Sequence, residues 1–141
     1  MIDKSILVRG SPARAFSLFT ERASAWWPPS RRHLGDPESQ ILLQESGRFW
    51  ERSNDGREVD LGRVRSWEPP SRLLLDFYVG TDAQHPTEVE VTFEAEGEST
   101  RVRVQHRPTA LSIEPWTRRN AAFEASWSLL LPAFASFSHE V

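Results

Sequence analysis

The clearest structural pattern in the chain lies at residues 87–95, Thr87-Glu88-Val89-Glu90-Val91-Thr92-Phe93-Glu94-Ala95. Apolar and polar side chains alternate along it, as expected for an antiparallel strand with one face in the core and the other in solvent. After a turn at residues 96–98, residues 100–106 repeat the alternation, with an inner face of Val102, Val104 and His106. The outer face of the first stretch is acidic and that of the second is basic, so we predict two neighbouring strands that also interact across their exposed faces.

Shorter segments of the same period precede this pair and predict a larger antiparallel sheet. They lie at residues 4–9, 41–45, 49–52, 58–67 and 72–79. A hairpin signal, Asn54-Asp55-Gly56, separates the third segment from the fourth. Between the first and second segments, Ser11-Pro12 predicts the start of a helix and Trp26-Trp27-Pro28-Pro29 predicts its end, with a loop over residues 28–40.

After Pro108 the period changes to that of a helix. Apolar side chains recur along one continuous stripe, at Trp116, Phe123, Trp127, Leu130, Phe134 and Phe137. This helix is the only predicted element long enough to cover the apolar face of the sheet. The pattern therefore predicts an α+β domain in which a long C-terminal helix packs on an antiparallel sheet.

The composition fits one domain and excludes several kinds of site. A chain of 141 residues without a linker predicts a single domain over residues 1–141. The absence of cysteine excludes disulfides, thiolate metal ligands and thiol catalysis, and it fits the reducing cytoplasm. No apolar run is long enough for a signal peptide or a membrane span. The net charge of −3 argues against nucleic acid as a partner, and the pairs Arg31-Arg32 and Arg118-Arg119 are interpreted as solvated surface.

A series of short motifs spans almost the whole chain, from Ile6 to Phe134. They are, in order, Ser11-Pro12, Ala15-Phe16, Phe19-Thr20, Trp26-Trp27-Pro28, Gly47-Arg48-Phe49-Trp50-Glu51-Arg52, Asp55-Gly56, Gly62-Arg63-Val64, Trp67-Glu68-Pro69-Pro70-Ser71-Arg72-Leu73, Thr87-Glu88-Val89-Glu90-Val91-Thr92-Phe93, Thr100-Arg101-Val102 and His106. In this order they resemble the START-like (SRPBCC) superfamily. Within it, the chain is similar to the small bacterial proteins that resemble the C-terminal domain of the activator of Hsp90 ATPase (AHSA1-like proteins).

The resemblance implies a helix-grip fold, in which a curved antiparallel sheet wraps around a long C-terminal helix in the order β-α-α-β(5–6)-α. It also implies an apolar cavity between sheet and helix, but no particular chemistry. The chain departs from the family at Ser126, where glycine is usual just before the tryptophan of the last helix. The chaperone-binding domain of the activator has no counterpart in this sequence, which weakens the expectation of chaperone activation.

His106 is the first candidate functional residue. Strand parity places it on the inner face, where a neutral imidazole can bond to a ligand or act as a base near neutral pH. The alternative is a half-exposed histidine at a strand end that pairs with backbone.

Glu51 is the second candidate, because it shares a strand face with Phe49 and points inward if Phe49 does. A carboxylate inside an apolar cavity must be paired or protonated. We therefore expect Glu51, with His106 or an arginine, to form the polar end of the pocket. The alternative is a β-bulge near Gly47 that turns Glu51 to solvent.

The remaining candidates are apolar side chains expected around the cavity. With the two polar candidates they make a predicted ligand-binding set of Trp27, Phe49, Glu51, Phe77, Phe93, Val104, His106, Phe123 and Trp127. No metal site is predicted, because the histidines lie far apart in the sequence. No cofactor is predicted either, since the chain has no phosphate loop or dinucleotide fingerprint, and it has no GxSxG nucleophile motif.

The leading functional hypothesis is a cytoplasmic protein that binds a small apolar or amphipathic molecule in the cavity. One alternative is a protein-interaction module of the chaperone-cofactor kind. Another is a cyclase- or hydratase-type enzyme that uses the same cavity, with Glu51 and His106 as acid and base. Catalysis is the least favoured of the three, and a homodimer is left open by the sequence.

Overall fold

The computed structural model describes all residues from 1 to 141 as seven strands, three α-helices and one 3-10 turn. The elements are β1 (Ile2–Arg9), α1 (Pro12–Glu21), α2 (Ala23–Trp26), the turn η1 (Pro29–Arg31), β2 (Gln40–Leu43), β3 (Arg48–Arg52), β4 (Glu58–Glu68), β5 (Arg72–Phe77), β6 (Thr87–Glu96), β7 (Ser99–Arg107) and α3 (Ile113–Glu140). This order confirms the predicted β-α-α-β-α arrangement, with six strands between the second helix and the last.

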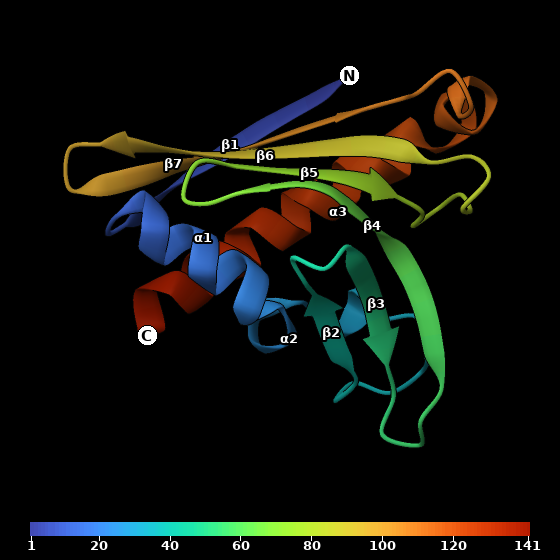
Figure 1. The fold of residues 1–141 in the computed structure, drawn as a ribbon, viewed down its shortest axis with the longest axis horizontal. Helices are drawn as coiled ribbons and strands as arrows, with labels where there is room; N and C mark the ends of the chain where they lie inside the picture. Colours follow the sequence, from blue (N-terminus) through green and yellow to red (C-terminus); the bar gives the residue numbers. More distant parts are fainter.

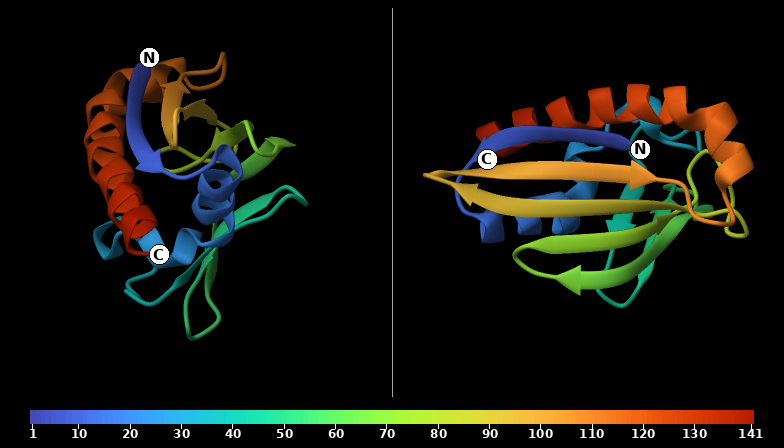
Figure 2. Two further views of the ribbon diagram at one scale, coloured as in Figure 1. Left: turned by 90° about the vertical axis from the view of Figure 1, so that its left-hand side faces the viewer. Right: turned by 90° about the horizontal axis from the view of Figure 1, so that it is seen from above.

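The strands form one antiparallel sheet in the order β1-β7-β6-β5-β4-β3-β2. The sheet curls, so that β1 lies along α3 while β2 and β3 turn away at the other end (Figures 1 and 2). Helices α1 and α2 pack beside α3 on the same side of the sheet. The structure therefore has the predicted helix-grip fold.

The pair β6 and β7 has the predicted register and inner face. Val91 lies opposite Val104 and Val89 lies opposite His106, and all four side chains are buried. The predicted exposed pairing between the two strands is made by Arg101, which contacts Glu96, and by Arg107, which contacts Glu88 and Glu90. Arg103 contacts Asp3 of β1 instead. Exposed ion pairs contribute little stability, so the association of β6 and β7 is stabilised mainly by the burial of their apolar inner face.

Helix α3 covers the inner face of the sheet, as its apolar stripe predicts. It buries Phe123, Trp127, Leu130, Leu131, Phe134 and Ser138, and it continues through Pro132 to its end. Helix α1 begins where predicted, at Ser11, whose hydroxyl accepts a 3.2 Å hydrogen bond from the backbone N–H of Arg14. No helix of the structure is both long and apolar enough to cross a membrane.

Candidate functional site

The space between the sheet and α3 holds a small, mainly apolar cavity. It measures about 30 Å³ and lies between the end of β5, the chain after α2, and the middle of α3. Its lining consists of Trp27, Arg31, His33, Phe77, Val79, Phe123, Ser126, Trp127 and Leu130. A second cavity of about 10 Å³ lies deeper, has only apolar lining residues, and shares Trp27, Phe77 and Trp127 with the first.

Both cavities are far smaller than a typical ligand pocket of roughly 300–1,000 Å³. Aromatic rings fill most of the space between sheet and helix, where the sequence analysis predicted a pocket. The ring of Phe77 lies 6.1 Å from that of Trp127 and 6.3 Å from that of Phe49, measured between centroids. A molecule of several rings therefore enters only if these side chains move.

The first cavity adjoins a depression on the surface. His33 and Val79 also line a depression of about 360 Å³ beside the chain after β5. That depression shares Gly80, Thr81 and Asp82 with a polar groove of about 280 Å³ at the first turns of α3. The loop between β5 and β6 thus separates the cavity from solvent.

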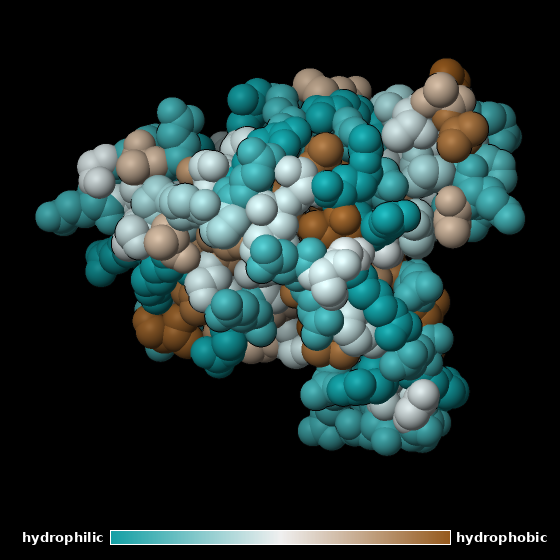
Figure 3. Space-filling model, viewed as in Figure 1, coloured by the Kyte–Doolittle hydropathy of each residue, from teal (hydrophilic) through white to brown (hydrophobic).

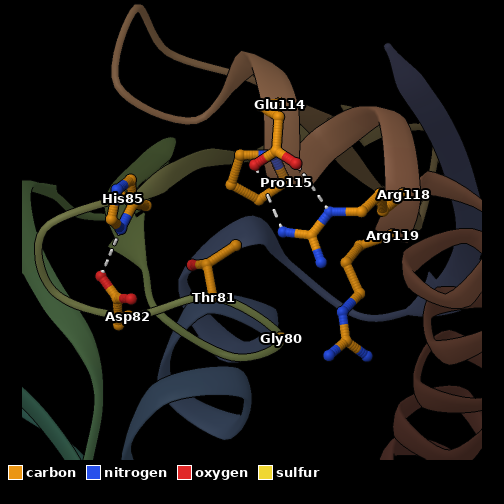
Figure 4. Close-up of a pocket in the computed structure, with 8 residues that line it drawn as sticks. All are labelled: Gly80, Thr81, Asp82, His85, Glu114, Pro115, Arg118 and Arg119. Carbon is orange, nitrogen blue, oxygen red and sulfur yellow. Dashed lines mark hydrogen bonds and ion pairs between the residues drawn. The ribbon is translucent and has the colours of Figure 1, made fainter.

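Figure 4 shows the polar groove, whose side chains are largely paired with one another. Asp82 contacts His85 at 2.8 Å, and Arg118 contacts Glu114 at 3.0 Å. The hydrogen bond from His85 lowers the pKa of the Asp82 carboxyl. None of the lining residues is hydrophobic, so the groove offers no surface for an apolar ligand.

His106 has its full set of hydrogen bonds within the protein. The indole N–H of Trp127 donates to its Nδ1 at 3.0 Å, and its Nε2 lies 2.7 Å from the hydroxyl oxygen of Thr87. Because the indole can only donate, Nδ1 is the acceptor and the ring proton sits on Nε2. The Thr87 hydroxyl then donates to the backbone carbonyl of Phe77 at 3.3 Å.

This environment keeps His106 neutral. The residue is fully buried, and its burial lowers its pKa from the ordinary 6.5 to about 3. The prediction that it faces inward is confirmed, and the alternative of a half-exposed histidine bonded to backbone is wrong. Since both ring nitrogens are occupied and no cavity reaches the ring, His106 acts here as a support for Trp127.

Glu51 is also fully buried, and its carboxylate holds the loop before β2. Oε1 accepts from the backbone N–H of His33 at 2.9 Å, while Oε2 accepts from the N–H of Leu34 at 3.2 Å and from the Ser39 hydroxyl at 2.9 Å. The register between β3 and β4 shifts between Phe49 and Trp50, but this bulge does not turn Glu51 to solvent. That alternative is therefore wrong.

Arg32 completes the anchoring of this loop. Its guanidinium donates to the backbone carbonyls of Ser24 at 2.8 Å, Trp27 at 2.9 Å, and Ser39. Burial lowers the pKa of Arg32, and the negative charge of Glu51 partly offsets that effect. The interpretation of Arg31-Arg32 as solvated surface is wrong, because Arg32 ties the loop to the chain around α2 and Arg31 lines the cavity.

The structure brings together only part of the predicted set. Trp27, Phe77, Phe123 and Trp127 line the first cavity, and Phe49 lines the second. Glu51, His106, Phe93 and Val104 are buried but line neither of them. For all nine residues, a role in ligand binding stays a prediction.

The polar lining of the cavity comes from residues that the sequence analysis missed, namely Arg31, His33 and Ser126. Ser126 gave one signal, since it replaces the usual glycine next to Trp127. Arg31 and His33 gave none, because charged residues in a loop with several prolines are normally solvated. No group of three or more His, Cys, Asp or Glu side chains is placed to hold a metal ion.

A curled antiparallel sheet around a long C-terminal helix, with an aromatic cavity between them, defines a helix-grip protein of the START-like class. The chain belongs to the family described as Activator of Hsp90 ATPase homolog 1-like protein, whose sequence profile matches residues 9–137. Among proteins with curated descriptions, none matches the chain.

Several solved structures share the fold. The self-sacrificing resistance protein CalC from Micromonospora echinospora is 26% identical with a TM-score of 0.75, over 99% of this chain and 94% of that one. The anthrahydroquino-γ-pyrone synthase Txn09 is 29% identical with a TM-score of 0.62, over 96% and 94% of the two chains. A protein from Arthrobacter aurescens has a TM-score of 0.69 over 99% and 86%, and at 14% identity it shows the fold alone.

Proposed function

We propose that this protein binds a small, flat aromatic molecule between the sheet and α3. The observation that carries the proposal is the cavity where Trp27, Phe77, Phe123 and Trp127 meet. Aromatic walls favour aromatic ligands, because ring stacking adds about 0.5–1.5 kcal/mol per pair to the burial of apolar area. The polar residues at the same cavity can orient such a ligand.

The comparisons support an aromatic ligand. Txn09 is by its description a synthase of an anthrahydroquinone-type γ-pyrone, which is a flat polycyclic product. That comparison covers 96% of this chain and 94% of Txn09, and the two sequences are 29% identical. The similarity therefore includes sequence as well as fold. A ligand of this shape could contact the aromatic walls of the cavity once the side chains there have moved apart.

Binding requires the cavity to widen toward the depression with which it shares His33 and Val79. The loop between β5 and β6 lies against Phe123, as the position of Gly80 shows: a Cβ placed there would lie 2.6 Å from Phe123 Cε1. Outward movement of this loop together with Phe123 would join the cavity to the depression of about 360 Å³ beside it. The combined space is then of the size that ligand pockets have.

The enzyme hypothesis based on Glu51 and His106 gains no support from the geometry. Each side chain uses its polar atoms on protein partners, and neither lines the cavity. Acid–base catalysis requires titratable groups within reach of the substrate. A binding role therefore fits the site better than a catalytic one.

A protein-interaction role is the second candidate, and one surface feature favours it. Apolar side chains gather over the start of α3 in Figure 3, where Leu111 is 64% and Ile113 is 63% exposed. We expect that, if this surface serves a chaperone, purified Hsp90 binds the wild type and not a Leu111→Ser, Ile113→Ser variant. Equal binding to both would exclude this surface.

Native mass spectrometry of freshly purified protein, compared with the denatured sample, tests the proposed ligand directly. An adduct of a few hundred daltons that is lost on denaturation supports it. A titration with 2-(hydroxymethyl)anthraquinone, followed by tryptophan quenching, supplies the affinity. Phe77→Leu should weaken this affinity, whereas Phe93→Leu, a matched change on the same sheet face but away from both cavities, should not. No quenching of the wild type by this probe or by its carboxylate analogue, or equal losses in both variants, would overturn the proposal.

A further inference from the structure

We propose that Arg31 anchors an ionised oxygen of the ligand, so that the molecule bound is an aromatic acid or an ionised phenol rather than a neutral ring system. This inference rests on the proposed function, because it names the chemical class of a molecule bound in the same cavity. It is carried by the contacts of Arg31 and by the absence of any compensating group around its guanidinium.

Arg31 is a cation without a partner at an aromatic cavity. It lines the cavity, and its Nε is buried with no hydrogen-bond partner. None of the ion pairs in the molecule includes it. The two cation–π contacts belong to Arg22 and Arg48, so no ring compensates the charge of Arg31 either.

The neighbouring Arg32 is an example of a guanidinium that has a structural role within the protein. The Nε of Arg32 is also buried without a partner, but its two Nη atoms donate to three backbone carbonyls, and the charge of Glu51 acts on its guanidinium. A buried donor without a partner costs free energy, and proteins pair nearly all of them. Arg31 differs from Arg32 because no atom of its guanidinium has a hydrogen-bond or ion-pair partner in the protein, so we assign that partner to an anion of the ligand.

The backbone around Arg31 is held against the aromatic wall. The indole N–H of Trp27 donates to the carbonyl of Arg31 at 3.1 Å, and the N–H of Arg31 donates to the carbonyl of Pro28 at 3.0 Å. Arg32 in turn donates to the carbonyl of Trp27 at 2.9 Å. A ring that packs on Trp27 thus lies at a defined place relative to Arg31, and an acidic substituent on that ring can reach the guanidinium.

The chemistry of the guanidinium selects the class of substituent. Its planar set of N–H donors matches a carboxylate, which can accept two parallel hydrogen bonds, and it also binds a phenolate oxygen. His33 and the Ser126 hydroxyl line the same cavity and can supply further hydrogen bonds. In the polar groove of Figure 4, Arg118 is already paired with Glu114, and Arg119 is exposed, so water can satisfy its guanidinium without a ligand anion.

The test uses a matched pair of probes of one shape. Anthraquinone-2-carboxylate carries the anion, and 2-(hydroxymethyl)anthraquinone is its neutral counterpart. We expect wild-type protein to bind the carboxylate about tenfold or more tightly than the neutral probe, as a charge-assisted bond implies. Arg31→Gln should remove this preference, so that the two probes bind with similar affinities, and circular dichroism with thermal unfolding checks that the variant is folded. Arg31→Lys should keep part of the preference for the carboxylate probe, because lysine retains the positive charge.

Arg63→Gln is the control, because Arg63 is exposed on β4 away from the cavity, and it should keep the wild-type preference. Replacing the carboxylate by 2-hydroxyanthraquinone, measured below and above the ionisation of its phenol, distinguishes a phenolate ligand from a carboxylate. Equal binding of both matched probes by wild type, or an unchanged preference in Arg31→Gln, would overturn the role of Arg31 while the proposed function stands. Failure of all probes to bind would overturn both.

Discussion

Trp127 on α3 donates its indole N–H to Nδ1 of His106 on β7 across 3.0 Å of the protein interior. The bond ties the long helix to the end of β7, the strand next to the edge strand β1, through two buried side chains. It also fixes the ring of Trp127, which lines both cavities. The inward-facing histidine therefore shapes the candidate site indirectly, by orienting one of its walls.

The first prediction concerns pH. The folded protein holds the pKa of His106 near 3, against 6.5 for the free side chain. Between these values the unfolded chain binds a proton that the folded one does not, so stability falls as pH falls through this window and is fully present above it. This residue should contribute a slope of up to ~1.4 kcal/mol per pH unit. Urea unfolding at pH 7, 6 and 5 should show a shallower dependence for His106→Gln, and identical slopes would contradict the assignment.

The second prediction concerns the bond itself. Trp127→Phe keeps a ring but leaves Nδ1 of His106 without its donor, and we expect a loss of about 1–3 kcal/mol in the free energy of unfolding. His106→Phe removes the acceptor instead. Because the two side chains interact directly, the double variant should lose less than the sum of the single losses. Additive losses in chemical denaturation would show that the bond contributes no coupling.

The third prediction concerns Glu51 as the anchor of the loop at residues 33–39. Glu51→Ala removes the acceptor of two backbone N–H groups and a buried negative charge near Arg32, so we expect a loss of about 3 kcal/mol in stability. Hydrogen exchange at the amides of His33 and Leu34 should accelerate. The control is Glu45→Ala on an exposed turn, which should stay within about 0.5 kcal/mol of wild type. Unchanged exchange at both amides would refute the anchoring role.

The fourth prediction compares two glycines with positive φ. Gly80 has φ of +79°, and an added Cβ would meet Phe123 at 2.6 Å, whereas Gly97 has φ of +64° and nothing within 4 Å. Gly97→Ala should cost about 1–2 kcal/mol from backbone strain alone. Gly80→Ala should cost about 1–3 kcal/mol more because it also displaces Phe123. Equal losses in thermal or urea unfolding would mean that the loop yields without moving Phe123.

The alternation of side chains along a strand correctly predicted which of these strand residues are buried. It placed His106 with Val102 and Val104, and Glu51 with Phe49, and all five side chains are buried. The long apolar stripe placed Phe123, Trp127, Leu130 and Phe134 on the covered face of α3. These predictions succeed because the period of two or 3.6 residues is a local property of the backbone.

The partners of the buried polar groups were not predictable in the same way. Glu51 was expected with His106 or an arginine at the polar end of a pocket. It lies near Arg32, but it lines neither cavity and accepts hydrogen bonds from the backbone of residues 33 and 34. Arg31 and Arg32 were interpreted as surface, although one lines the cavity and the other is tied to three carbonyls. Each of these contacts depends on the path of an irregular loop. Such a loop has no hydrophobic periodicity from which the direction of its side chains could be predicted.

The sequence by itself determined the fold class, the inner faces of the two strands within residues 87–106 and the covered face of the last helix, because local periodicity determines which side chains are buried together. Only the tertiary structure decided which buried groups meet, how little space the aromatic rings leave between sheet and helix, and that Arg31 stands unpaired at that space. Those outcomes depend on side-chain volumes and loop paths in three dimensions, where segments distant in the chain pack against one another.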